Sequence, residues 1–410
     1  MTAPARRAPA TCLPATYLPG LDAARALGAA AVVATHTAFF TGRDTHGPLF
    51  QMLARLDVGV AIFFVLSGFL LFRPYVLAHH RGRPWPATAT YLRRRAQRIL
   101  PAYWLVVGVA LLALTANRSE GTGGWLRQLT LTQIYSGRFD RAGLSQTWSL
   151  ATEVSFYLLL PLLASVVLRG NPRPALTLAA LLVVPPLWRV YLAVDPRLLP
   201  DTGDLWLPGY LDWFALGMLL ALVQVQGAGR SPGEWRRRLV DLAQARGLCW
   251  AGALVLLVVA GTPLAGGYGF VALTTPEKLV KHLLYGAIGL LVVLPLVLRR
   301  PDDSPTSRVL ASRPVRWLGE ISYGVFLCHL LVLQAVTNLR HQALFTGSWV
   351  LTFLLVWTLS LGVASLSYVA LERPLLRLGS RRRPASGSSV DQSPASAPTQ
   401  SSCTTGSLPP

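Results

Sequence analysis

The sequence predicts an all-α protein that crosses a lipid bilayer about ten times. Hydrophobic residues make up 52% of the 410 residues and charged residues only 14%, whereas a soluble domain carries about 25% charged residues. The apolar residues form long runs that are separated by short charged loops. This pattern is typical of helices that span a membrane and is not expected of a water-soluble particle.

The predicted spans lie at regular intervals along the chain. The seventh has fifteen residues, which is short because about 20 residues are needed to cross the hydrocarbon core. The ten segments are 22–42, 57–77, 99–116, 148–168, 175–194, 207–226, 248–262, 279–298, 317–338 and 348–371.

Basic residues concentrate in every second loop, which predicts the orientation of the chain. Because Lys and Arg favour the cytoplasmic side, both termini are expected in the cytoplasm. The Arg-rich, Ala-rich composition suggests a bacterial source and hence a bacterial plasma membrane. We expect a cytoplasmic segment at 1–20, a transmembrane domain at 21–378 and a disordered, Ser/Pro-rich cytoplasmic tail at 379–410.

The net charge of +20 is spread over these alternate loops, which argues against a nucleic-acid-binding surface. The four cysteines lie far apart along the chain. Their positions show neither a disulfide framework nor the spacing of a metal site. The partner indicated by composition is therefore the lipid bilayer.

Ionisable residues inside predicted spans mark a candidate catalytic site, because they are costly in a membrane. Arg25 and His36 are eleven positions apart, so on a helix they share one face and stand about 16 Å apart. Counted from the span ends, His36, Glu153 and His329 lie at similar depths. A buried histidine with a carboxylate partner can act as a general base. The sequence thus predicts His36 as the base and Glu153 as its partner.

Each of these residues also has a structural interpretation. An intramembrane histidine can hydrogen-bond between helices without any catalytic role, and this alternative applies more strongly to His329 than to His36. Asp57, Asp212 and Glu320 lie near predicted span ends and are expected to be interfacial.

A run of basic residues precedes the third predicted span. These residues suit a topogenic signal or a site for anionic lipid headgroups. Guanidinium groups clustered at the start of a helix also suit multidentate binding of phosphate. The run consists of Arg93, Arg94, Arg95 and Arg98.

Six motifs follow one another along the membrane region. They are Leu21–Gly28 with His36, Gly59–Leu70, Tyr91–Trp104, Trp148–Tyr157, Ile321–His329 and Glu372–Pro374. In this order they resemble the membrane-bound acyltransferase 3 family, which O-acylates cell-surface glycans, lipids and some secondary metabolites. The resemblance extends over about 17–378.

The resemblance implies transfer of an acyl group, usually acetyl, from cytoplasmic acyl-CoA to an acceptor hydroxyl on an envelope glycan, a glycolipid or a related metabolite. His36 would deprotonate the hydroxyl, or would itself carry the acyl group. Glu153 would orient His36, and Arg25 would help to hold the donor. The resemblance makes the basic run a site for the CoA phosphates, and it implies substrate contacts for Ser67, Trp148, Tyr157 and His329.

The sequence departs from the family pattern at two positions. Ala61 replaces a common acidic residue, and Val154 replaces the second of two consecutive carboxylates that often occur in the fourth helix. A role that depends on that second acid is therefore not expected here. The chain resembles the stand-alone form, without a hydrolase-like domain after the helices.

Two other classes of protein remain open at this point. A secondary transporter would also place ionisable residues within the membrane, although no internal repeat is visible. A lipid-binding scaffold could use the basic run for anionic headgroups. Saturable binding of CoA would distinguish an acyltransferase from both.

Overall fold

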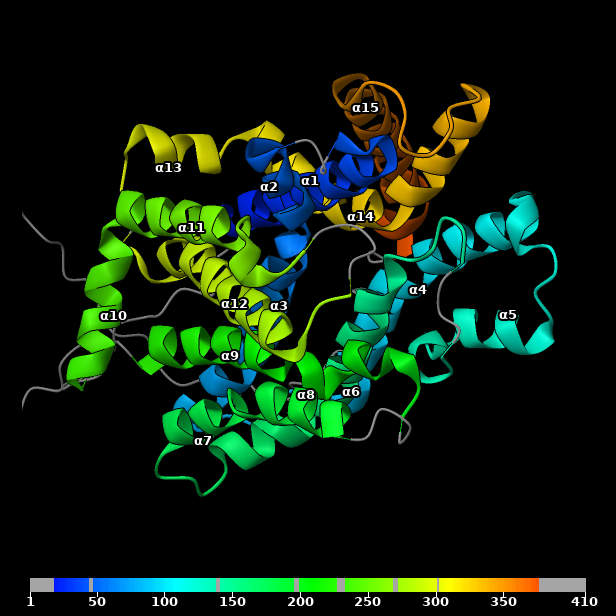
Figure 1. Ribbon diagram of the computed structural model, residues 1–410. Helices are drawn as coiled ribbons and strands as arrows, with labels where there is room; N and C mark the ends of the chain where they lie inside the picture. Colours follow the sequence, from blue (N-terminus) through cyan, green and yellow to red (C-terminus); the bar gives the residue numbers. More distant parts are fainter. Residues whose placement is uncertain are drawn as a thin grey trace, which may run out of the picture.

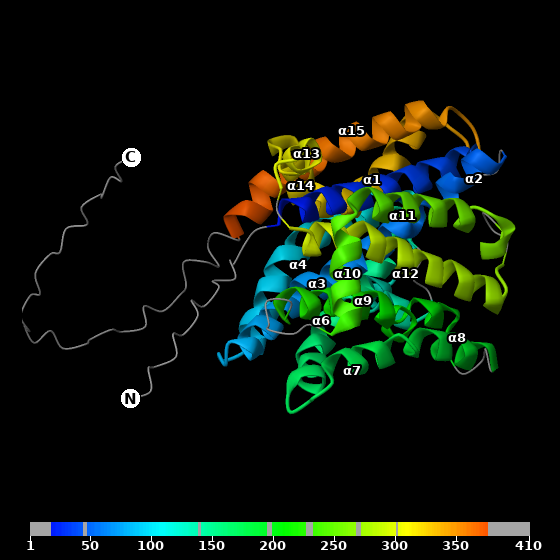
Figure 2. The ribbon, with the colours of Figure 1, turned by 90° about the vertical axis from the view of Figure 1, so that its left-hand side faces the viewer.

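A computed structural model describes residues 18–43, 47–137, 141–194, 199–226, 233–267, 272–300 and 302–375. The described residues form helices and no strands, as predicted. The predicted tail at 379–410 and almost all of the segment 1–20 lie outside the described residues. Figure 1 and Figure 2 show long helices that run side by side.

In the part of the chain that the structure describes, nine helices of 15 or more residues form the bundle. They are α1 (Pro19–Thr41), α3 (Gly59–His80), α4 (Thr88–Ala113), α6 (Thr147–Leu168), α9 (Leu211–Gln226), α11 (Arg246–Ala260), α12 (Thr275–Leu298), α14 (Arg313–Leu339) and α15 (Trp349–Ser367). Shorter helices connect or extend them: α2 (Pro48–Ala54), α5 (Thr122–Leu129), α7 (Pro174–Leu181), α8 (Val184–Val194), α10 (Glu234–Gln244) and α13 (Pro305–Leu310).

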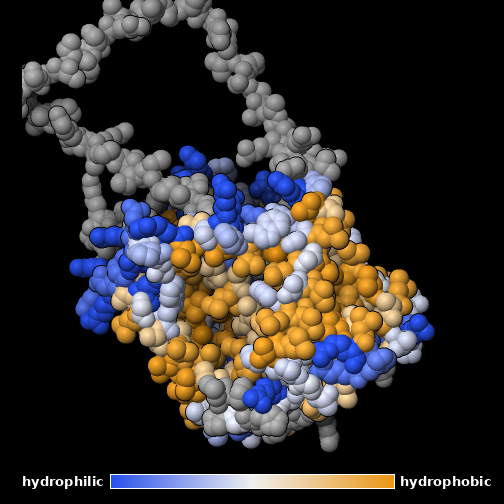
Figure 3. Space-filling model, turned by 90° about the horizontal axis from the view of Figure 1, so that it is seen from above, coloured by the Kyte–Doolittle hydropathy of each residue, from blue (hydrophilic) through white to orange (hydrophobic). Residues whose placement is uncertain are grey.

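The apolar surface of the bundle matches a bilayer. Side chains such as Leu112 and Leu366 are about 70% exposed although they are fully apolar. Figure 3 shows a broad hydrophobic belt on one face, with hydrophilic side chains gathered at its ends. Within the described residues, nine helical segments are long and apolar enough to span a membrane, and there are ten if the bent pair α10–α11 is counted as one span.

The direction of neighbouring helices confirms that α11 crosses the bundle. Helices α9 and α12 run parallel, because Trp213 bonds to the carbonyl of His282 near their starts and Gln224 to that of Val297 near their ends. The chain between two parallel helices must return, and α11 makes that return beside α12. Its fifteen residues span about 22 Å, while α10 is bent from it by 89°.

Two predicted spans differ from the structure. The helix of the third predicted span is α4, which begins at Thr88, eleven residues before the predicted start at residue 99. The prediction followed the apolar run, whereas Arg and Ala are also good helix formers. The basic run therefore lies inside α4 and not in front of it, which corrects the expected position. The fifth span is divided into α7 and α8 beside Pro185 and Pro186, which lack the N–H that a continuous helix needs.

Glycines let the central helices approach closely. A Cβ atom added to Gly217 on α9 would lie 2.0 Å from the carbonyl oxygen of Val65 on α3. A Cβ on Gly68 of α3 would lie 2.1 Å from the carbonyl oxygen of Phe214 on α9. Small residues at such crossings allow the backbones to pack directly in a membrane protein. This crossing fixes Ser67, the neighbour of Gly68, in the centre of the bundle.

Arg55 anchors the loop after α11. Its side chain is buried, and it donates hydrogen bonds to the carbonyl oxygens of Ala260, Ala265, Gly266 and Gly267 at 2.6–3.3 Å. These carbonyls would lose a partner in an apolar surrounding if the guanidinium were removed.

We therefore expect Arg55→Met to lower the free energy of unfolding by about 3 kcal/mol, because several buried carbonyls lose their donor. The measurement is thermal unfolding of the purified protein in detergent. Arg340→Met, at an exposed residue, is the control and should leave the transition within a degree or two. An unchanged transition in Arg55→Met would show that these bonds contribute little.

Candidate active site

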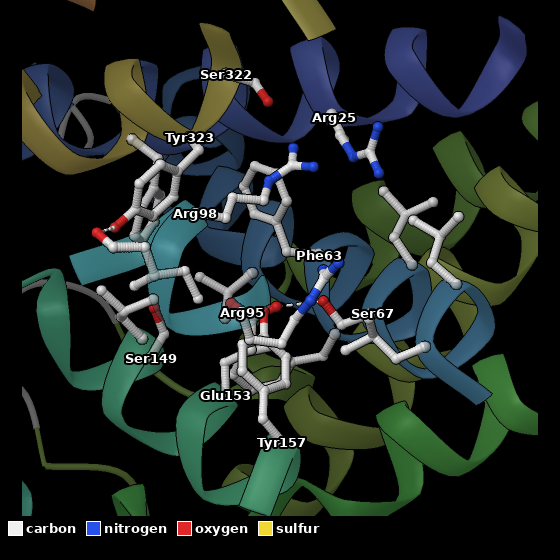
Figure 4. A pocket seen from close by; sticks show the side chains of 18 residues that line it. Arg25, Phe63, Ser67, Arg95, Arg98, Ser149, Glu153, Tyr157, Ser322 and Tyr323 are labelled. Atoms are coloured by element: carbon white, nitrogen blue, oxygen red, sulfur yellow. Dashed lines mark hydrogen bonds between the residues drawn. The ribbon is translucent and has the colours of Figure 1, made fainter. Parts of the chain in front are cut away.

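Two adjoining cavities lie in the centre of the bundle. We call the first the arginine cavity. It is lined by residues of α1, α3, α4, α6 and α14, among them Arg25, Ser67, Arg95, Arg98, Glu153 and Tyr157. Figure 4 shows that these side chains converge from different helices. The guanidinium groups outnumber the carboxylate, so the cavity is suited to an anion.

The structure divides the basic run into two pairs. Arg95 and Arg98 line the arginine cavity, whereas Arg93 and Arg94 are exposed on the surface of α4. Arg95 and Arg98 are three positions apart and share one face of α4, whereas Arg93 and Arg94 precede them and are exposed. Arg25 joins the first pair from α1 and is bridged to Asp22 at 2.8 Å.

Glu153 belongs to the arginine cavity. Its carboxylate accepts a hydrogen bond from the hydroxyl of Ser67 on α3, and Arg95 and Tyr157 line the same space. The two side chains face one another in Figure 4. Ser67 and Tyr157, which the resemblance placed at the substrate, thus lie together around this carboxylate.

We call the second space the histidine cavity. It contains His36, together with an aromatic wall formed by Trp148, Tyr210 and Trp213. Tyr210 stands 5.2 Å from Trp148 and 5.1 Å from Trp213 between ring centroids. Trp148 is thus placed in the cavity that holds His36.

Charged pairs surround this aromatic wall. Lys281 is 2.8 Å from Asp57, and Lys278 is 2.5 Å from Asp204. The hydroxyl of Tyr285 also donates to Asp57. Each lysine is therefore matched by a carboxylate, and the cavity offers both donors and acceptors to a polar molecule.

A buried relay completes one side of the histidine cavity. Arg189 donates to Nδ1 of His282 at 2.9 Å, and Nε2 of His282 donates to Asp212 at 2.7 Å. All three residues are at most 7% exposed. The ring of His282 stacks on Trp213 at 4.5 Å. Because the Nδ1 atom must accept from the guanidinium, His282 is neutral in this arrangement.

The two cavities meet at three residues, Val60, Ser149 and Phe326, which line both. We call this set the waist. His36 lies on one side of the waist, and Ser67 and Glu153 lie on the other. A molecule in the arginine cavity and a molecule in the histidine cavity can therefore approach each other only at this place in the described structure.

His36 contacts His329 across the α1–α14 crossing. Nε2 of His329 is 3.2 Å from Nδ1 of His36, and the ring centroids are 5.0 Å apart. Nδ1 of His36 also bonds to the carbonyl of Val32 at 2.8 Å. His329 is fully buried behind His36, so the structure brings these two residues together, whereas Glu153 lies in the other cavity.

Sequence reasoning missed several residues of the histidine cavity. Asp57 and Asp212 were expected at the membrane interface, yet the first lines the cavity and the second is buried in the relay. Arg189, Lys281 and His282 all lie inside predicted spans. His36 was identified as an ionisable residue inside a predicted span, and the same criterion could have identified these three residues.

The fold and the site define a multi-pass membrane protein with two polar cavities inside its helix bundle. A family model described as an acyltransferase domain matches residues 18–369. The chain belongs to this family, acyltransferase 3, and is an acyltransferase enzyme.

Individual relatives are distant in sequence. The chain is 25% identical to the acyltransferase MdmB of Streptomyces mycarofaciens, over 90% of this chain and 94% of that protein. It is 27% identical to the exopolysaccharide production protein ExoZ of Rhizobium meliloti, over 80% of this chain and 92% of that protein. It is 25% identical to the peptidoglycan O-acetyltransferase OatA of Listeria monocytogenes, over 78% of this chain and 50% of that protein. No solved structure matches the chain.

Proposed function

We propose that this protein transfers an acyl group, with acetyl as the first candidate, from acyl-CoA to a hydroxyl group of an envelope glycan, a glycolipid or a related metabolite. The observation that carries the proposal is the meeting of the two cavities at the waist, with guanidinium groups on one side and His36 on the other. The donor would occupy the arginine cavity and the acceptor the histidine cavity.

The arginine cavity fits the chemistry of the donor. Acyl-CoA has a polyanionic head and a long, thin arm that ends in the thioester. Arg95 and Arg98 enter from α4 and Arg25 from α1, so charge-assisted hydrogen bonds to phosphate are available from two directions. The Ser67–Glu153 pair lines the same cavity beside apolar side chains and can hold the polar groups of the arm.

The histidine cavity fits an acceptor that is rich in hydroxyl groups. The rings of Trp148, Tyr210 and Trp213 offer flat apolar surfaces, and the surrounding ion pairs offer hydrogen-bond partners. Ligand pockets commonly combine aromatic side chains with a small number of placed polar groups. The names of the relatives OatA and ExoZ point to peptidoglycan and exopolysaccharide as the kind of acceptor.

The reaction can be written with His36 as the general base. Nε2 of His36 takes the proton of the acceptor hydroxyl while the oxygen attacks the thioester carbonyl. The tetrahedral intermediate collapses, the C–S bond breaks, and the CoA sulfur leaves. The proton on His36 then passes to the sulfur, so the products are the ester and free CoA thiol.

The alternative is an acyl-histidine intermediate, in which Nε2 of His36 attacks the thioester first. Incubation with acetyl-CoA that carries a labelled acetyl group, without an acceptor, distinguishes the two routes. Direct attack leaves the protein unlabelled in a single turnover. Label on His36 would establish the covalent route.

The two pairs of the basic run give the test of the donor site. We expect Arg95→Gln or Arg98→Gln to weaken CoA binding by about 10- to 100-fold, since each loses charge-assisted hydrogen bonds worth about 1.5–3 kcal/mol. Arg93→Gln and Arg94→Gln are the matched controls, because they remove the same charge from the exposed side of α4.

The measurement is calorimetric titration of the purified protein in detergent with CoA, followed by release of CoA from acetyl-CoA. Equal losses in all four variants would indicate a general effect of charge and not a site in the cavity. Absence of CoA binding in the folded wild-type protein would overturn the donor assignment and favour a transporter.

The location of the reaction follows from the charge pattern. The end of the bundle where α1 and α4 begin, which carries Arg25 and the basic run, would face the cytoplasm of a bacterial plasma membrane. The alternate basic loops predict this orientation. The first and last long helices of the described residues, α1 and α15, begin and end on the same side of the bundle (Figure 2), which supports an even number of crossings.

A further inference from the structure

The hydrogen bonds of the His36–His329 pair fix the protons on both rings. Nδ1 of His36 is 2.8 Å from the carbonyl oxygen of Val32, and Nδ1 of His329 is 2.6 Å from the carbonyl oxygen of Phe326. A carbonyl oxygen can only accept, so each Nδ1 carries a hydrogen. A neutral imidazole with a hydrogen on Nδ1 has a lone pair on Nε2.

The hydrogen bond between the two rings therefore runs from His36 as donor to His329 as acceptor. Nε2 of His329 lies 3.2 Å from Nδ1 of His36, so its lone pair accepts from the N–H of His36. This hydrogen is shared between Val32 and His329. The remaining nitrogen of His36, Nε2, is left with its lone pair, and His36 is the member of the pair that lines the histidine cavity.

Glu153 occupies a different place from the one that a catalytic partner of His36 needs. It lines the arginine cavity and accepts from Ser67, across the waist from His36. In many hydrolases a carboxylate accepts the Nδ1 hydrogen of the catalytic histidine and fixes its tautomer. In this structure that hydrogen goes to the Val32 carbonyl at 2.8 Å and to a second histidine, His329, at 3.2 Å.

We propose that His329 is the positioning residue for His36 and takes the part that the sequence assigned to Glu153. The inference rests on the proposed function, in which His36 is the base. His329 would not touch the substrate. Together with the Val32 carbonyl it would hold the tautomer of His36 that has its lone pair on Nε2, and its own lone pair would stabilise the imidazolium after proton uptake.

The proton balance of this step is simple. Before reaction His36 has one hydrogen, on Nδ1, and His329 has one hydrogen, on Nδ1. The acceptor hydroxyl transfers its proton to Nε2 of His36, which becomes a cation with two N–H groups. Its Nδ1–H still donates to two acceptors, the Val32 carbonyl and the lone pair of His329. The proton leaves to the CoA sulfur, and both rings return to their starting state.

Two substitutions separate this role from packing. Phe in place of His329 keeps a ring but has no lone pair. Gln has a side-chain oxygen that can reach the position of Nε2 and accept from His36. The assay is hydrolysis of acetyl-CoA by the purified protein, with water as the acyl acceptor, and calorimetric binding of CoA reports on the donor site.

We expect His329→Phe to lower kcat by about 10²-fold, a factor at the lower end of the range for general acid–base catalysis. The affinity for CoA should be unchanged. His329→Gln is expected to recover at least tenfold over His329→Phe. In the double variant His36→Ala/His329→Phe, the rate should equal that of His36→Ala alone, since residues that act as one unit are not additive.

The inference would be overturned by wild-type kcat in His329→Phe, or by equal losses in the Phe and Gln variants. His329→Leu replaces the Phe variant in the comparison if Phe does not give folded protein. A wild-type rate in His36→Ala would overturn the proposed base itself. An inactive His36→Ala beside a fully active His329→Phe would leave the proposed function intact and remove only the role of His329.

Discussion

Replacing His36 with glutamine is expected to lower kcat for acyl transfer by about 10³-fold. The side chain lines the histidine cavity beside the waist, and its Nε2 lone pair is the base of the proposed reaction. General-base catalysis contributes about 10²–10⁴ in rate. Glutamine keeps polarity and approximate size, but it cannot take up the proton.

The measurement for His36→Gln is release of CoA from acetyl-CoA under saturating donor. CoA affinity should stay within about twofold of the wild type, because the guanidinium groups lie in the other cavity. His80→Gln is the control, since His80 is exposed at the end of α3. If His36→Gln releases CoA at the wild-type rate, a different residue activates the acceptor.

Replacing Gly217 with alanine is expected to lower the free energy of unfolding by about 4 kcal/mol or more, within the range of exceptional single substitutions. The added Cβ atom would lie 2.0 Å from a backbone oxygen of α3 and 2.6 Å from the N of Phe69. Backbone cannot move aside as a flexible side chain can. Helices α3 and α9 would have to separate, and Ser67 would move with α3.

Gly108→Ala on α4 is the matched control, because a Cβ atom there would meet no neighbouring atom within 4 Å. Thermal unfolding in detergent and the monodisperse fraction after purification measure the effect. We expect Gly217→Ala to give little folded protein, whereas Gly108→Ala resembles the wild type or is slightly more stable, since alanine is the better helix former. Equal stability of both variants would contradict the close crossing.

The sequence predicted the architecture well because hydropathy and span length are local properties. Even the short seventh span was placed correctly, at α11. The start of α4 was misjudged because apolar content marks the part of a helix that lies in lipid, and the helix itself continues beyond it. The same error hid the fact that Arg93 and Arg94 point away from the cavity that Arg95 and Arg98 share.

The partners within the site depend on which helices are neighbours, and a hydropathy profile does not contain that information. Helix α1 packs beside α14, whereas α6 packs against α3. His36 on α1 therefore meets His329, and Glu153 on α6 meets Ser67. The predicted depths placed His36, Glu153 and His329 in one layer, and depth alone leaves open which of the three side chains are partners.

The waist formed by Val60, Ser149 and Phe326 separates the proposed donor site from the proposed acceptor site. Under this proposal, CoA enters and leaves by the arginine-rich end, and the acceptor approaches from the histidine cavity, so neither molecule has to cross the bundle. Only the acyl group passes from the arginine cavity to the histidine cavity. The enzyme would then couple movement of the acyl group between the two cavities to the free energy of thioester cleavage.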